Sequence, residues 1–456
     1  MTTPVSPEGR VDLAPPADVV SIAQRLRDAG YETWTVGGAV RDALTGGHPK
    51  DWDLATSARP RDVQRLFRRT VPVGLAHGTV GVLWKDGSLY EVTTFRRDVE
   101  TDGRHARVVF ADHVDEDLQR RDFTINAIAW HPLTGELCDP TGGLADVRAG
   151  VLRTVGEPAE RFREDRLRVL RALRFAGRFG LRIDDATWQA ARDAAPELVH
   201  LSAERVREEL LKVLRQVDPP SVSLRLYEAC GALAHLYPEL QACVGAPDLE
   251  GDVWSHLLAT VDAIPLYRAE LRIPALLHDA GKPLTREEVD GRASWPEHAA
   301  AGAAVAHRLM RRLKFSNAET DRAVHLVAQH ADVPAPDAGA PELRRWLRRV
   351  GREYVRDLFR LRIADLRARG DDPRLADTER LLRRVRRELG REAPLEIGDL
   401  AIGGGELRQL GLPPGPLYGE ILRDLLERVT DDPRLNERQT LMGMIAQRID
   451  AGGEDD

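Results

Sequence analysis

Aromatic residues, lysine and cysteine are all scarce in this chain of 456 residues. Phe, Trp and Tyr make up 5% of it, and many apolar positions are Ala, Leu or Val, which favours a mainly helical body. The three cysteines, Cys138, Cys230 and Cys243, form no CxxC pair, so the sequence indicates neither a disulfide framework nor a zinc knuckle. We therefore expect a reducing, cytoplasmic location.

Long apolar runs are also absent. No stretch approaches the roughly 20 apolar residues that a membrane helix needs, so we expect no membrane partner. The chain begins with acids and prolines rather than with a basic and then apolar leader. Hydrophobic content of 42% and charged content of 30% fit a soluble protein, and the length allows roughly two to four domains.

Positive charge is abundant, although the net charge is −7, and it is almost entirely arginine. Lysine occurs only at positions 50, 85, 212, 282 and 314. Arginines are dense at Arg161–Arg182 and Arg344–Arg369, and either segment could follow a nucleic-acid backbone. The alternative for each arginine is a salt bridge on a helix face, so charge alone does not identify a partner.

The most informative segment is TVGGAVRDALTGGHPKDWDLATS, Thr35–Ser57. A β-branched run ends at Gly37 and Gly38 before a helix-like segment, where glycines offer backbone N–H groups to a phosphate. Asp51 and Asp53 follow two apart on a predicted strand, so both carboxylates point to one face. A Gly-Gly pair alone is usually a turn, and Asp-x-Asp alone a solvated loop. In this order they predict a Mg²⁺-dependent site for a nucleoside triphosphate.

Two further groups fit phosphoryl transfer to a hydroxyl, which needs divalent ions. Glu91 lies in a β-rich run and is a candidate third carboxylate that helps to activate the hydroxyl; the alternative is a polar residue on an exposed strand face. The string RRDFTINA, Arg120–Ala127, could hold a triphosphate and a ribose hydroxyl, although RRD alone is a common surface tripeptide.

A candidate base-reading group lies in RFREDRLRVLRALRFAGRFG. Glu164, Asp165 and Arg168 are three and four residues apart, hence on one face of a predicted helix. They could form an intrahelical salt bridge of only about 0.3–0.5 kcal/mol. Alternatively, a carboxylate accepts from the amino group of C or A while the guanidinium donates to the same base edge, which rejects U and G.

In this order the motifs resemble those of the class II tRNA nucleotidyltransferases, the family of CCA-adding enzymes and bacterial poly(A) polymerases. The resemblance covers roughly residues 20–240 and returns at 396–440. It implies addition of C and A to a tRNA 3′ end from CTP and ATP, without a nucleic-acid template, with Mg²⁺ on Asp51 and Asp53 and with Glu91 in catalysis. The implied nucleotide-binding residues are Gly37, Gly38, Arg41, Arg120, Arg121, Asp122, Asn126, Glu164, Asp165 and Arg168.

A second possible active site is spread over WSHLL, PALLHDAGKP, PEHAAAG and VAQHAD. Single histidines are usually structural, but this set resembles an HD-type phosphohydrolase domain, and imidazoles suit Mn, Fe, Ni or Zn better than Mg. The last metal ligand of such domains is usually an aspartate, which here could be Asp332 or Asp365. The alternative is an inactive, purely structural HD domain. The candidate ligands are His256, His278, Asp279, His298 and His330.

The expected fold class is α+β, with a small polymerase-β-like sheet domain before a mostly α-helical neck, HD domain and tail. Strands are expected at 32–36, 51–55, 71–74, 78–84, 89–95 and 126–131, and a polar loop at 96–112. The expected domains are a disordered N-terminus at 1–15, the nucleotidyltransferase head at 16–150, a base- and tRNA-binding neck at 151–245, the HD domain at 246–335 and a tRNA-binding helical body and tail at 336–456.

Alternatives remain for the activity. A poly(A) polymerase, or a partial enzyme that adds only CC or only A, shares the chemistry. Family members limited to CC have a shortened loop, whereas Arg96–Phe110 is near full length, which disfavours CC-only and leaves A-only open. A rival class is an HD phosphohydrolase whose head only binds nucleotide or RNA. Gly411 and Gly415 could offer N–H groups to tRNA phosphates or form a simple interhelical turn. The sequence does not set the oligomeric state.

Overall fold

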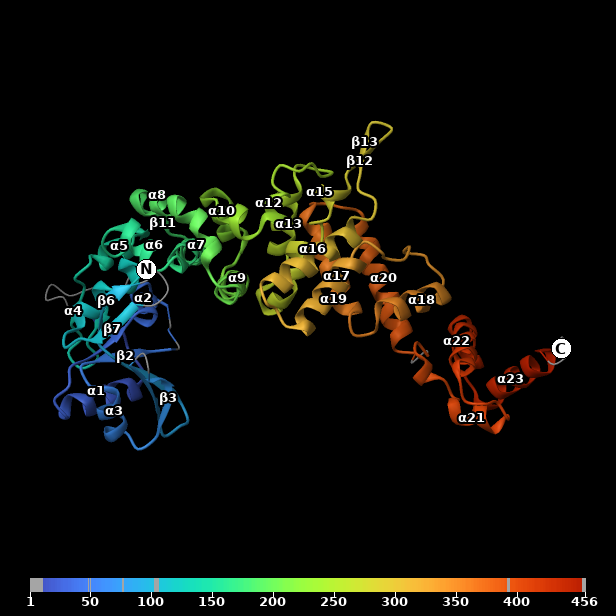
Figure 1. Cartoon of the computed structure of the whole chain (residues 1–456), viewed down its shortest axis with the longest axis horizontal. Helices are drawn as coiled ribbons and strands as arrows, with labels where there is room; N and C mark the ends of the chain where they lie inside the picture. Colours follow the sequence, from blue (N-terminus) through green and yellow to red (C-terminus); the bar gives the residue numbers. More distant parts are fainter. Residues whose placement is uncertain are drawn as a thin grey trace. The chain divides into compact units, whose positions relative to one another are not determined.

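The structure, a computed structural model, describes residues 11–47, 49, 51–75, 78–101, 106–391 and 394–452. The chain forms two compact units, residues 1–238 and 239–456 (Figure 1). The first contains the large sheet and the second is almost entirely helical, which confirms the predicted α+β class. Within the described ranges, no helix combines the length and the apolar character needed to span a bilayer.

A mixed sheet of seven strands, in the order β3-β4-β5-β2-β1-β8-β9, dominates the described part of the first unit. Strand β2 lies parallel to β5 and antiparallel to β1. The strands are β1 (Thr33–Val36), β2 (Asp53–Thr56), β3 (Thr70–Gly74), β4 (Thr79–Leu83), β5 (Leu89–Thr94), β8 (Ala129–Trp130) and β9 (Leu137–Cys138). The helices of the head are α1 (Ala17–Asp28), α2 (Gly38–Leu44), α3 (Pro60–Leu66), α4 (Val114–Gln119), the 3₁₀ helix η2 (Thr124–Asn126) and α5 (Gly143–Ala149).

Successive residues of β2 face opposite sides of this sheet. Leu54 belongs to one core, together with apolar residues of α1 and α3, whereas Ala55 belongs to a second core with Leu118 of α4. Because side chains alternate along a strand, Asp53 shares the face of Ala55. The first residue of β2 therefore projects from the same side of the sheet as α4.

Two segments of the head differ from the sequence prediction. The polar loop expected at 96–112 is wrong: β6 (Arg96–Thr101) and β7 (Ala106–Phe110) pair as an antiparallel hairpin. The reason is that β7 carries the β-branched pair Val108 and Val109, which favours a strand, a signal that the polar composition of the segment obscured. Residues 102–105, between the two strands, lie outside the described residues.

Disorder over 1–15 is likewise wrong for the part that the structure describes. Val11 and Leu13 are 5% and 7% exposed and belong to the core that α1 and α3 cover. The Val11 N–H donates to the Gly135 carbonyl, and the Val11 carbonyl accepts from Trp130 Nε1 at 2.7 Å. Apolar burial and these bonds hold the segment in place, while residues 1–10 lie outside the described residues.

The neck completes the first unit with helices, as the sequence predicted from residue 160 onward. A short parallel pair, β10 (Val151–Leu152) and β11 (Arg182–Ile183), joins its start to the end of α7. The neck helices are α6 (Pro158–Glu164), α7 (Leu167–Phe179), α8 (Asp185–Ala194), η3 (Ala195–His200), α9 (Ala203–Gln216), α10 (Ser221–Cys230) and α11 (Ala232–Leu236), and α12 (Pro238–Gln241) crosses the boundary to the second unit.

The second unit has an HD portion and a C-terminal portion with its own core. Helix α13 packs on α14 and α19, and α16 packs on α17. The first portion contains α13 (Val253–Asp262), η4 (Leu266–Leu271), α14 (Arg272–Leu277), α15 (Lys282–Thr285), α16 (His298–Arg312), α17 (Asn317–Gln329), α18 (Ala340–Val350), α19 (Val355–Ala368) and α20 (Arg374–Leu389). The last elements are η5 (Ile397–Asp399), α21 (Gly404–Gln409), α22 (Pro416–Asp431), η6 (Pro433–Leu435) and α23 (Arg438–Gly452).

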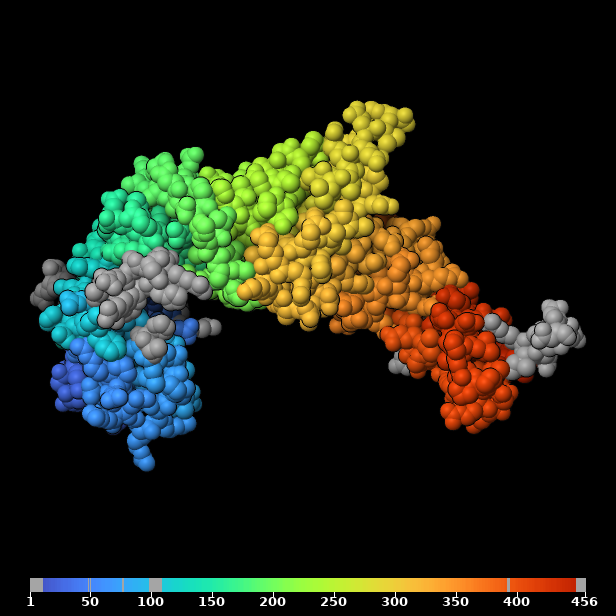
Figure 2. Space-filling view, viewed as in Figure 1, coloured from blue at the N-terminus to red at the C-terminus, as the bar shows by residue number. Residues whose placement is uncertain are grey.

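One hairpin interrupts the helices of this unit. Strands β12 (Glu287–Val289) and β13 (Arg292–Ser294) pair antiparallel and project away from the helical body (Figures 1 and 2). Every residue of β12 is exposed, including Val289 at 53%. The sequence did not predict this hairpin, because its residues EEVDGRAS are mostly charged or small.

Candidate active site

A cavity of about 730 Å³ lies in the first unit and is lined from β1, β2, β5, α7 and α9. The sequence predicted thirteen catalytic or nucleotide-binding residues in this unit, and the cavity brings most of them together. Those that line it are Gly37, Gly38, Arg41, Asp53, Glu91, Arg120, Arg121, Asp122, Asn126, Asp165 and Arg168. Asp51 and Glu164 are not among the lining residues.

The cavity is rich in positive charge although the whole chain carries −7. Ten arginine or lysine side chains and five carboxylates line it. A concave surface with such an excess attracts a polyphosphate. Sequence reasoning named four of the ten basic residues individually and missed Arg96, Arg171, Arg174, Arg178, Arg205 and Lys212.

Asp53 and Glu91 come from the adjacent parallel strands β2 and β5. Burial is the largest cause that raises the pKa of Asp53, to about 6, and the charge of Glu91 raises it further, while Arg121 opposes the shift. Asp53 as a whole residue nevertheless remains exposed to solvent. Hard carboxylate oxygens that repel one another in this way are a favourable donor set for Mg²⁺.

Asp51 is placed differently from the prediction, which put it on a strand from 51 to 55. Strand β2 begins at Asp53, and Asp51 is an exposed residue two positions before it. The strand starts later because β1 ends opposite, with Val36 paired to Asp53, so no partner backbone extends the ladder to Asp51. The charge of Asp51 still contributes to the raised pKa of Asp53.

Gly37 forms the turn between β1 and α2, and its backbone φ of +77° favours glycine. A Cβ atom at this position would lie 3.1 Å from Arg121 Nη1. The backbone conformation therefore favours glycine here, and a Cβ would also require the Arg121 guanidinium to shift by a few tenths of an ångström. The turn and the Arg121 side chain together face the cavity.

A chain of polar contacts connects α2 to α7 behind this turn. Arg41 donates to Asn126 Oδ1, Asn126 Nδ2 donates to Asp122 Oδ1 at 3.0 Å, and Arg171 Nε donates to Asp122 Oδ2 at 2.8 Å. Burial alone would raise the pKa of Asp122, but Arg171 and Asn126 hold it below its usual value. The guanidinium of Arg41 also lies 4.1 Å from the centre of the Phe179 ring. The network fixes these cavity-lining groups.

Asp117 is a functional candidate that sequence reasoning missed. Its side chain is buried and accepts from Arg120 Nε at 3.1 Å and from Arg121 Nη2 at 3.0 Å, as well as from the Arg96 backbone N–H. These arginines hold the pKa of Asp117 below its usual range, against the effect of burial. Asp117 therefore orients two guanidinium groups at the cavity. The spacing of three and four residues before Arg120 and Arg121 was the available signal.

The base-reading group does not lie on one helix, so that prediction is wrong. Helix α6 ends at Glu164, Asp165 is extended with φ −150°, and α7 begins at Leu167. The Asp165 carboxylate accepts from the Leu167 N–H at 3.0 Å, and this local bond competes with helix continuation. As a result Glu164, and not Asp165, pairs with Arg168, at 2.5 Å.

Arg205 of α9 is the partner of Asp165 and was also missed. Its Nη2 lies 2.7 and 3.0 Å from the two carboxylate oxygens of Asp165. Deeper in the neck, Arg174 pairs with Glu209 at 2.7 Å, with side-chain exposures of 4% and 1%. Both contacts connect α9 to the α6–α7 segment and so position the cavity wall. The segment LSAERVREELLKVL carried these residues without a local sign of their partners.

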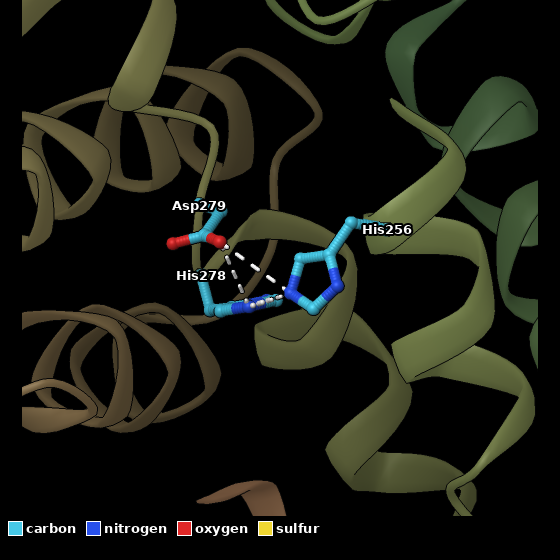
Figure 3. Close-up of side chains that lie close together, drawn as sticks. All are labelled: His256, His278 and Asp279. Atoms are coloured by element: carbon cyan, nitrogen blue, oxygen red, sulfur yellow. Dashed lines mark hydrogen bonds and ion pairs between the residues drawn. The ribbon is translucent and has the colours of Figure 1, made fainter. Parts of the chain in front are cut away.

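In the second unit, the residues predicted for the HD site lie in contact with one another. His256, His278 and Asp279 form an inner group, and Asp279, His298 and His330 form an outer group. Figure 3 shows both imidazoles of the inner group turned toward the Asp279 carboxylate. Asp279 Oδ2 lies 3.5 and 3.4 Å from Nε2 of His256 and His278, distances typical of ligands that share one ion.

Each of three imidazoles is oriented by a backbone carbonyl. Nδ1 of His278, His298 and His330 lies 2.7–2.8 Å from the carbonyl three residues earlier in the chain. A proton on Nδ1 leaves the Nε2 lone pair toward Asp279, which is how metal-binding histidines are commonly held. The buried Asp279 Oδ2 makes no hydrogen bond among the described residues, although the Lys282 ammonium lies 2.7 Å from it as an ion pair. These observations fit a site for a divalent transition metal.

The structure places one of the two candidate late aspartates beside the cluster. Asp365 Oδ1 lies 3.0 Å from His256 Nε2 and 3.8 Å from His278 Nε2. Asp332 is exposed and pairs with Arg349 at 2.5 Å. Asp365 is therefore the candidate, and the opposing His256 contact holds its pKa below its usual range despite burial.

Two other charged residues at the cluster, Asp248 and Arg369, were missed by the sequence reasoning, whereas Lys282 belongs to the motif PALLHDAGKP. Lys282 lies 2.6 Å from the buried Asp248 and 2.7 Å from Asp279, and Arg369 also contacts the cluster. Gly281 lets α16 approach closely, because a Cβ there would lie 2.1 Å from the His298 carbonyl. A cavity of about 390 Å³ opens onto Asp279, His298, His330 and Asp365.

Three family descriptions match successive parts of the chain. "Poly A polymerase head domain" matches residues 33–153, "Probable RNA and SrmB- binding site of polymerase A" matches 180–243, and "HD domain" matches 253–370. The last range includes Asp365 and extends beyond the boundary expected at residue 335.

Similar proteins are known along nearly the whole length of the chain. It is 34% identical to the CCA-adding enzyme of Geobacillus stearothermophilus over 94% of this chain and 96% of that protein. For the CCA-adding enzyme of Geobacillus kaustophilus the identity is 34%, over 96% and 98% of the two chains. The solved Bacillus stearothermophilus CCA-adding enzyme in complex with CTP is 31% identical with a TM-score of 0.72, covering 97% of this chain and 100% of that one.

Proposed function

Because the chain belongs to the family of CCA-adding enzymes, and is thus a nucleotidyltransferase, we propose that it adds C and A residues to a tRNA 3′ end. Its substrates are CTP, ATP and a tRNA, and no nucleic-acid template is used. One observation carries the proposal: Asp53 and Glu91 share a positively charged cavity with Asp165 and Arg168. The candidate groups for the reaction and those for reading the base therefore line one cavity, where they could contact the same bound nucleotide.

Asp51 and Asp53 are the proposed holders of Mg²⁺, and Glu91 is the proposed third carboxylate. Bound there, Mg²⁺ supplies positive charge to the triphosphate and favours attack by the 3′-hydroxyl. Asp53 and Glu91 already repel one another, as the raised pKa of Asp53 reflects. A divalent cation relieves that repulsion, so these residues are suited to bind one.

The triphosphate is proposed to lie against the Gly37 turn and the two arginines that Asp117 orients, Arg120 and Arg121. Arginine is suited to this task because its planar fork can donate two hydrogen bonds to phosphate oxygens. Asp122 and Asn126, which the network connects to Arg41 and Arg171, are proposed to bind the ribose hydroxyls.

Asp165 and Arg168 are proposed to read the base of the incoming nucleotide. Arg168 uses three N–H donors in its described contacts, to Glu164, to the Arg161 carbonyl and to the Arg120 carbonyl. A guanidinium has five donors, so donors remain for a base edge. Arg205 holds the Asp165 carboxylate in position while it accepts from the amino group of C or A.

Alanine at Arg168 or Asp165 should weaken base discrimination more than it weakens the reaction itself. Because one bidentate base contact gives roughly 1–3 kcal/mol of discrimination, the preference for CTP and ATP over UTP and GTP should fall about 5- to 150-fold. Competition among labelled nucleotides at fixed tRNA measures the ratio. Arg166→Ala is the matched control, since Arg166 pairs with the exposed Glu197 instead. An unchanged ratio in both test variants would contradict the base-reading role.

The apparent Mg²⁺ affinity should depend on pH through Asp53. With the pKa of Asp53 raised to about 6, a proton competes with the cation below that pH, whereas above it the carboxylate is ionised. The Mg²⁺ concentration for half-maximal incorporation should therefore rise up to about tenfold per pH unit below 6 and stay level from pH 7 to 8. Titrations of Mg²⁺ at several pH values measure it; a level profile down to pH 5 would contradict the assignment.

The proposal is tested with three tRNA transcripts, ending at the discriminator base, at C and at CC, each supplied with one labelled NTP and Mg²⁺. CTP use on the first two and ATP use on the third is the expected result. ATP use on the CC transcript alone would indicate an A-adding partial enzyme, and long A tails on unrelated RNA a poly(A) polymerase. No incorporation would refute the proposal.

A second activity is proposed for the HD domain: metal-dependent hydrolysis of phosphate esters, with Mn, Fe, Ni or Zn. Its support is the contact of the inner and outer groups beside a cavity that also carries Lys282, Arg362 and Arg369. A cytoplasmic location is also proposed, on the ground that Cys138, Cys230 and Cys243 are all free thiols.

A further inference from the structure

Five arginines of α20 (Figure 1) line a cavity of about 570 Å³ in the second unit. Among the described residues the sixth lining residue is Pro336, and no carboxylate lines this cavity. The five, here called the α20 arginine cluster, are Arg380, Arg383, Arg384, Arg386 and Arg387. We propose that this cluster binds the phosphate backbone of the tRNA. The inference rests on the proposed tRNA substrate and deepens it by naming a surface that holds the tRNA outside the nucleotide cavity.

The helix presents the cluster on one side. Each member is three or four residues from another member, so the five side chains share one face of α20. The opposite face is buried through Thr378, Leu381 and Val385. From Arg380 to Arg387 the helix rises by roughly 10 Å, a length over which one nucleic-acid strand carries about three phosphates. The cluster therefore matches a run of phosphates better than a single small anion.

Three members of the cluster have no counter-charge. The guanidinium groups of Arg383, Arg386 and Arg387 are exposed, and none of them takes part in a hydrogen bond or ion pair among the described residues. Glu379 is exposed four positions before Arg383, but it forms no ion pair with Arg383 in the described part of the chain and does not line the cavity. Like charges gathered in this way attract a polyanion.

The other two members are oriented without losing much of their charge. Arg384 donates to the carbonyls of Pro336 and Ala338, which carry no net charge. Arg380 forms an ion pair with Asp377, in which the two side chains are 61% and 39% exposed. Exposed ion pairs are weak, so a phosphate can replace the carboxylate. All five guanidinium groups can therefore contribute to binding of a polyanion.

Other arginines close in sequence are used differently. Each of the four arginines of α18 pairs with a carboxylate, so their charge is compensated within the protein. These four are Arg344, Arg345, Arg348 and Arg349. The contrast shows that a high density of arginine does not by itself leave charge free for a partner. It is the lack of carboxylate partners that distinguishes the α20 arginine cluster.

RNA is the polyanion that fits this chain. The proposed substrate is a tRNA, whose backbone carries one negative charge per nucleotide. The planar fork of an arginine donates two hydrogen bonds to one phosphate. Contacts to phosphates fix the position of a nucleic acid without reading its sequence, which suits an enzyme whose substrates are tRNAs of many sequences.

The test measures tRNA binding by the full chain at several salt concentrations. A triple variant, Arg383→Gln with Arg386→Gln and Arg387→Gln, should bind tRNA about tenfold or more weakly at about 50 mM salt. The slope of log affinity against log salt should become shallower by about 2 to 3. The single-turnover incorporation rate at saturating tRNA should not change, because no member of the cluster lines the nucleotide cavity.

Two control variants separate position and charge from folding. Lysine at the same three positions keeps the charge, so tRNA affinity should stay within about threefold of that of the wild-type chain. Arg308→Gln, Arg311→Gln and Arg312→Gln together remove as much charge from exposed positions of α16, outside the cavity, and should leave the salt slope unchanged. Equal weakening by this α16 variant, or loss of binding in the lysine variant, would overturn the inference.

A single variant covers the case in which the triple variant does not fold. Arg387→Gln alone should make the salt slope shallower by about 1, and an unchanged slope would overturn the inference. Competition by polyglutamate that depends on the cluster, with tRNA affinity unchanged in the variants, would assign the surface to an acidic protein and would also overturn it. A wild-type chain that neither binds nor extends tRNA would refute the proposed function itself, so the two failures are distinguishable.

Discussion

Replacing Asp53 by alanine should lower nucleotide incorporation by about a thousandfold or more while tRNA still binds. The carboxylate is the cavity's candidate metal ligand, and a catalytic metal contributes several kcal/mol of transition-state stabilisation; about 4 kcal/mol corresponds to a thousandfold in rate. Loss of the side chain should cost little folding stability, because the raised pKa of Asp53 indicates that its negative charge is poorly compensated. Single-turnover incorporation of labelled CTP and a tRNA gel-shift measure the two properties.

The matched control for this variant is Asp28→Ala. Asp28 belongs to the same unit, and its side chain is 64% exposed at the end of α1 and absent from the cavity lining. Its replacement removes the same charge and should leave incorporation within about twofold. Incorporation that persists in Asp53→Ala would move the reaction centre away from β2, and loss of tRNA binding would indicate a folding defect instead.

The second large effect concerns the HD domain. Asp279→Asn should lower the rate of phosphate-ester hydrolysis by about a hundredfold or more and leave nucleotide incorporation unchanged. Asp279 is the residue that the inner and outer groups share, so its charge is needed wherever the ion lies, and asparagine keeps the shape of the buried side chain. Assays of a 2′,3′-cyclic nucleotide and of a nitrophenyl phosphate, with Mn²⁺, Co²⁺ or Ni²⁺, measure the loss.

His307→Ala is the control for that variant, because His307 lies exposed on α16, the helix that carries His298 at its start. It removes an imidazole from the same helix without touching the cluster. A wild-type chain that hydrolyses neither compound with any of these metals would show that the cluster has only a structural role. Hydrolysis that survives in Asp279→Asn would place the activity elsewhere in the chain.

Most of the candidate site follows from local motifs, because strand ends, glycine turns and short acid–base strings are local in sequence. The residues that hold those motifs are not local. Arg205 lies 40 positions from Asp165, and Arg171 lies 49 from Asp122. Neither partner has a distinctive neighbourhood in a chain this rich in arginine, so only the packing of α9 and α7 against the head identifies them.

The end of the helix before Asp165 was also not predicted from the sequence. Helical spacing assigned Glu164, Asp165 and Arg168 to one face, and the local sequence contains no proline or glycine to interrupt the helix. A carboxylate that accepts from the Leu167 backbone N–H competes with the helix, and Arg205 stabilises that arrangement. Helix propensity predicts helix ends poorly where a side chain can accept the hydrogen bond of a nearby backbone N–H.

The near absence of lysine has a consequence for control of the nucleotide cavity. Nine of the ten basic side chains that line it are arginines, and Lys212 is the exception. Arginine keeps its proton at any pH a cell reaches, so the attraction for polyphosphate is constant from acidic to alkaline conditions. Acetylation of lysine, which erases charge on many RNA-binding surfaces, has a single target in this wall. Lysine acetylation therefore leaves nine of the ten basic side chains of this cavity charged.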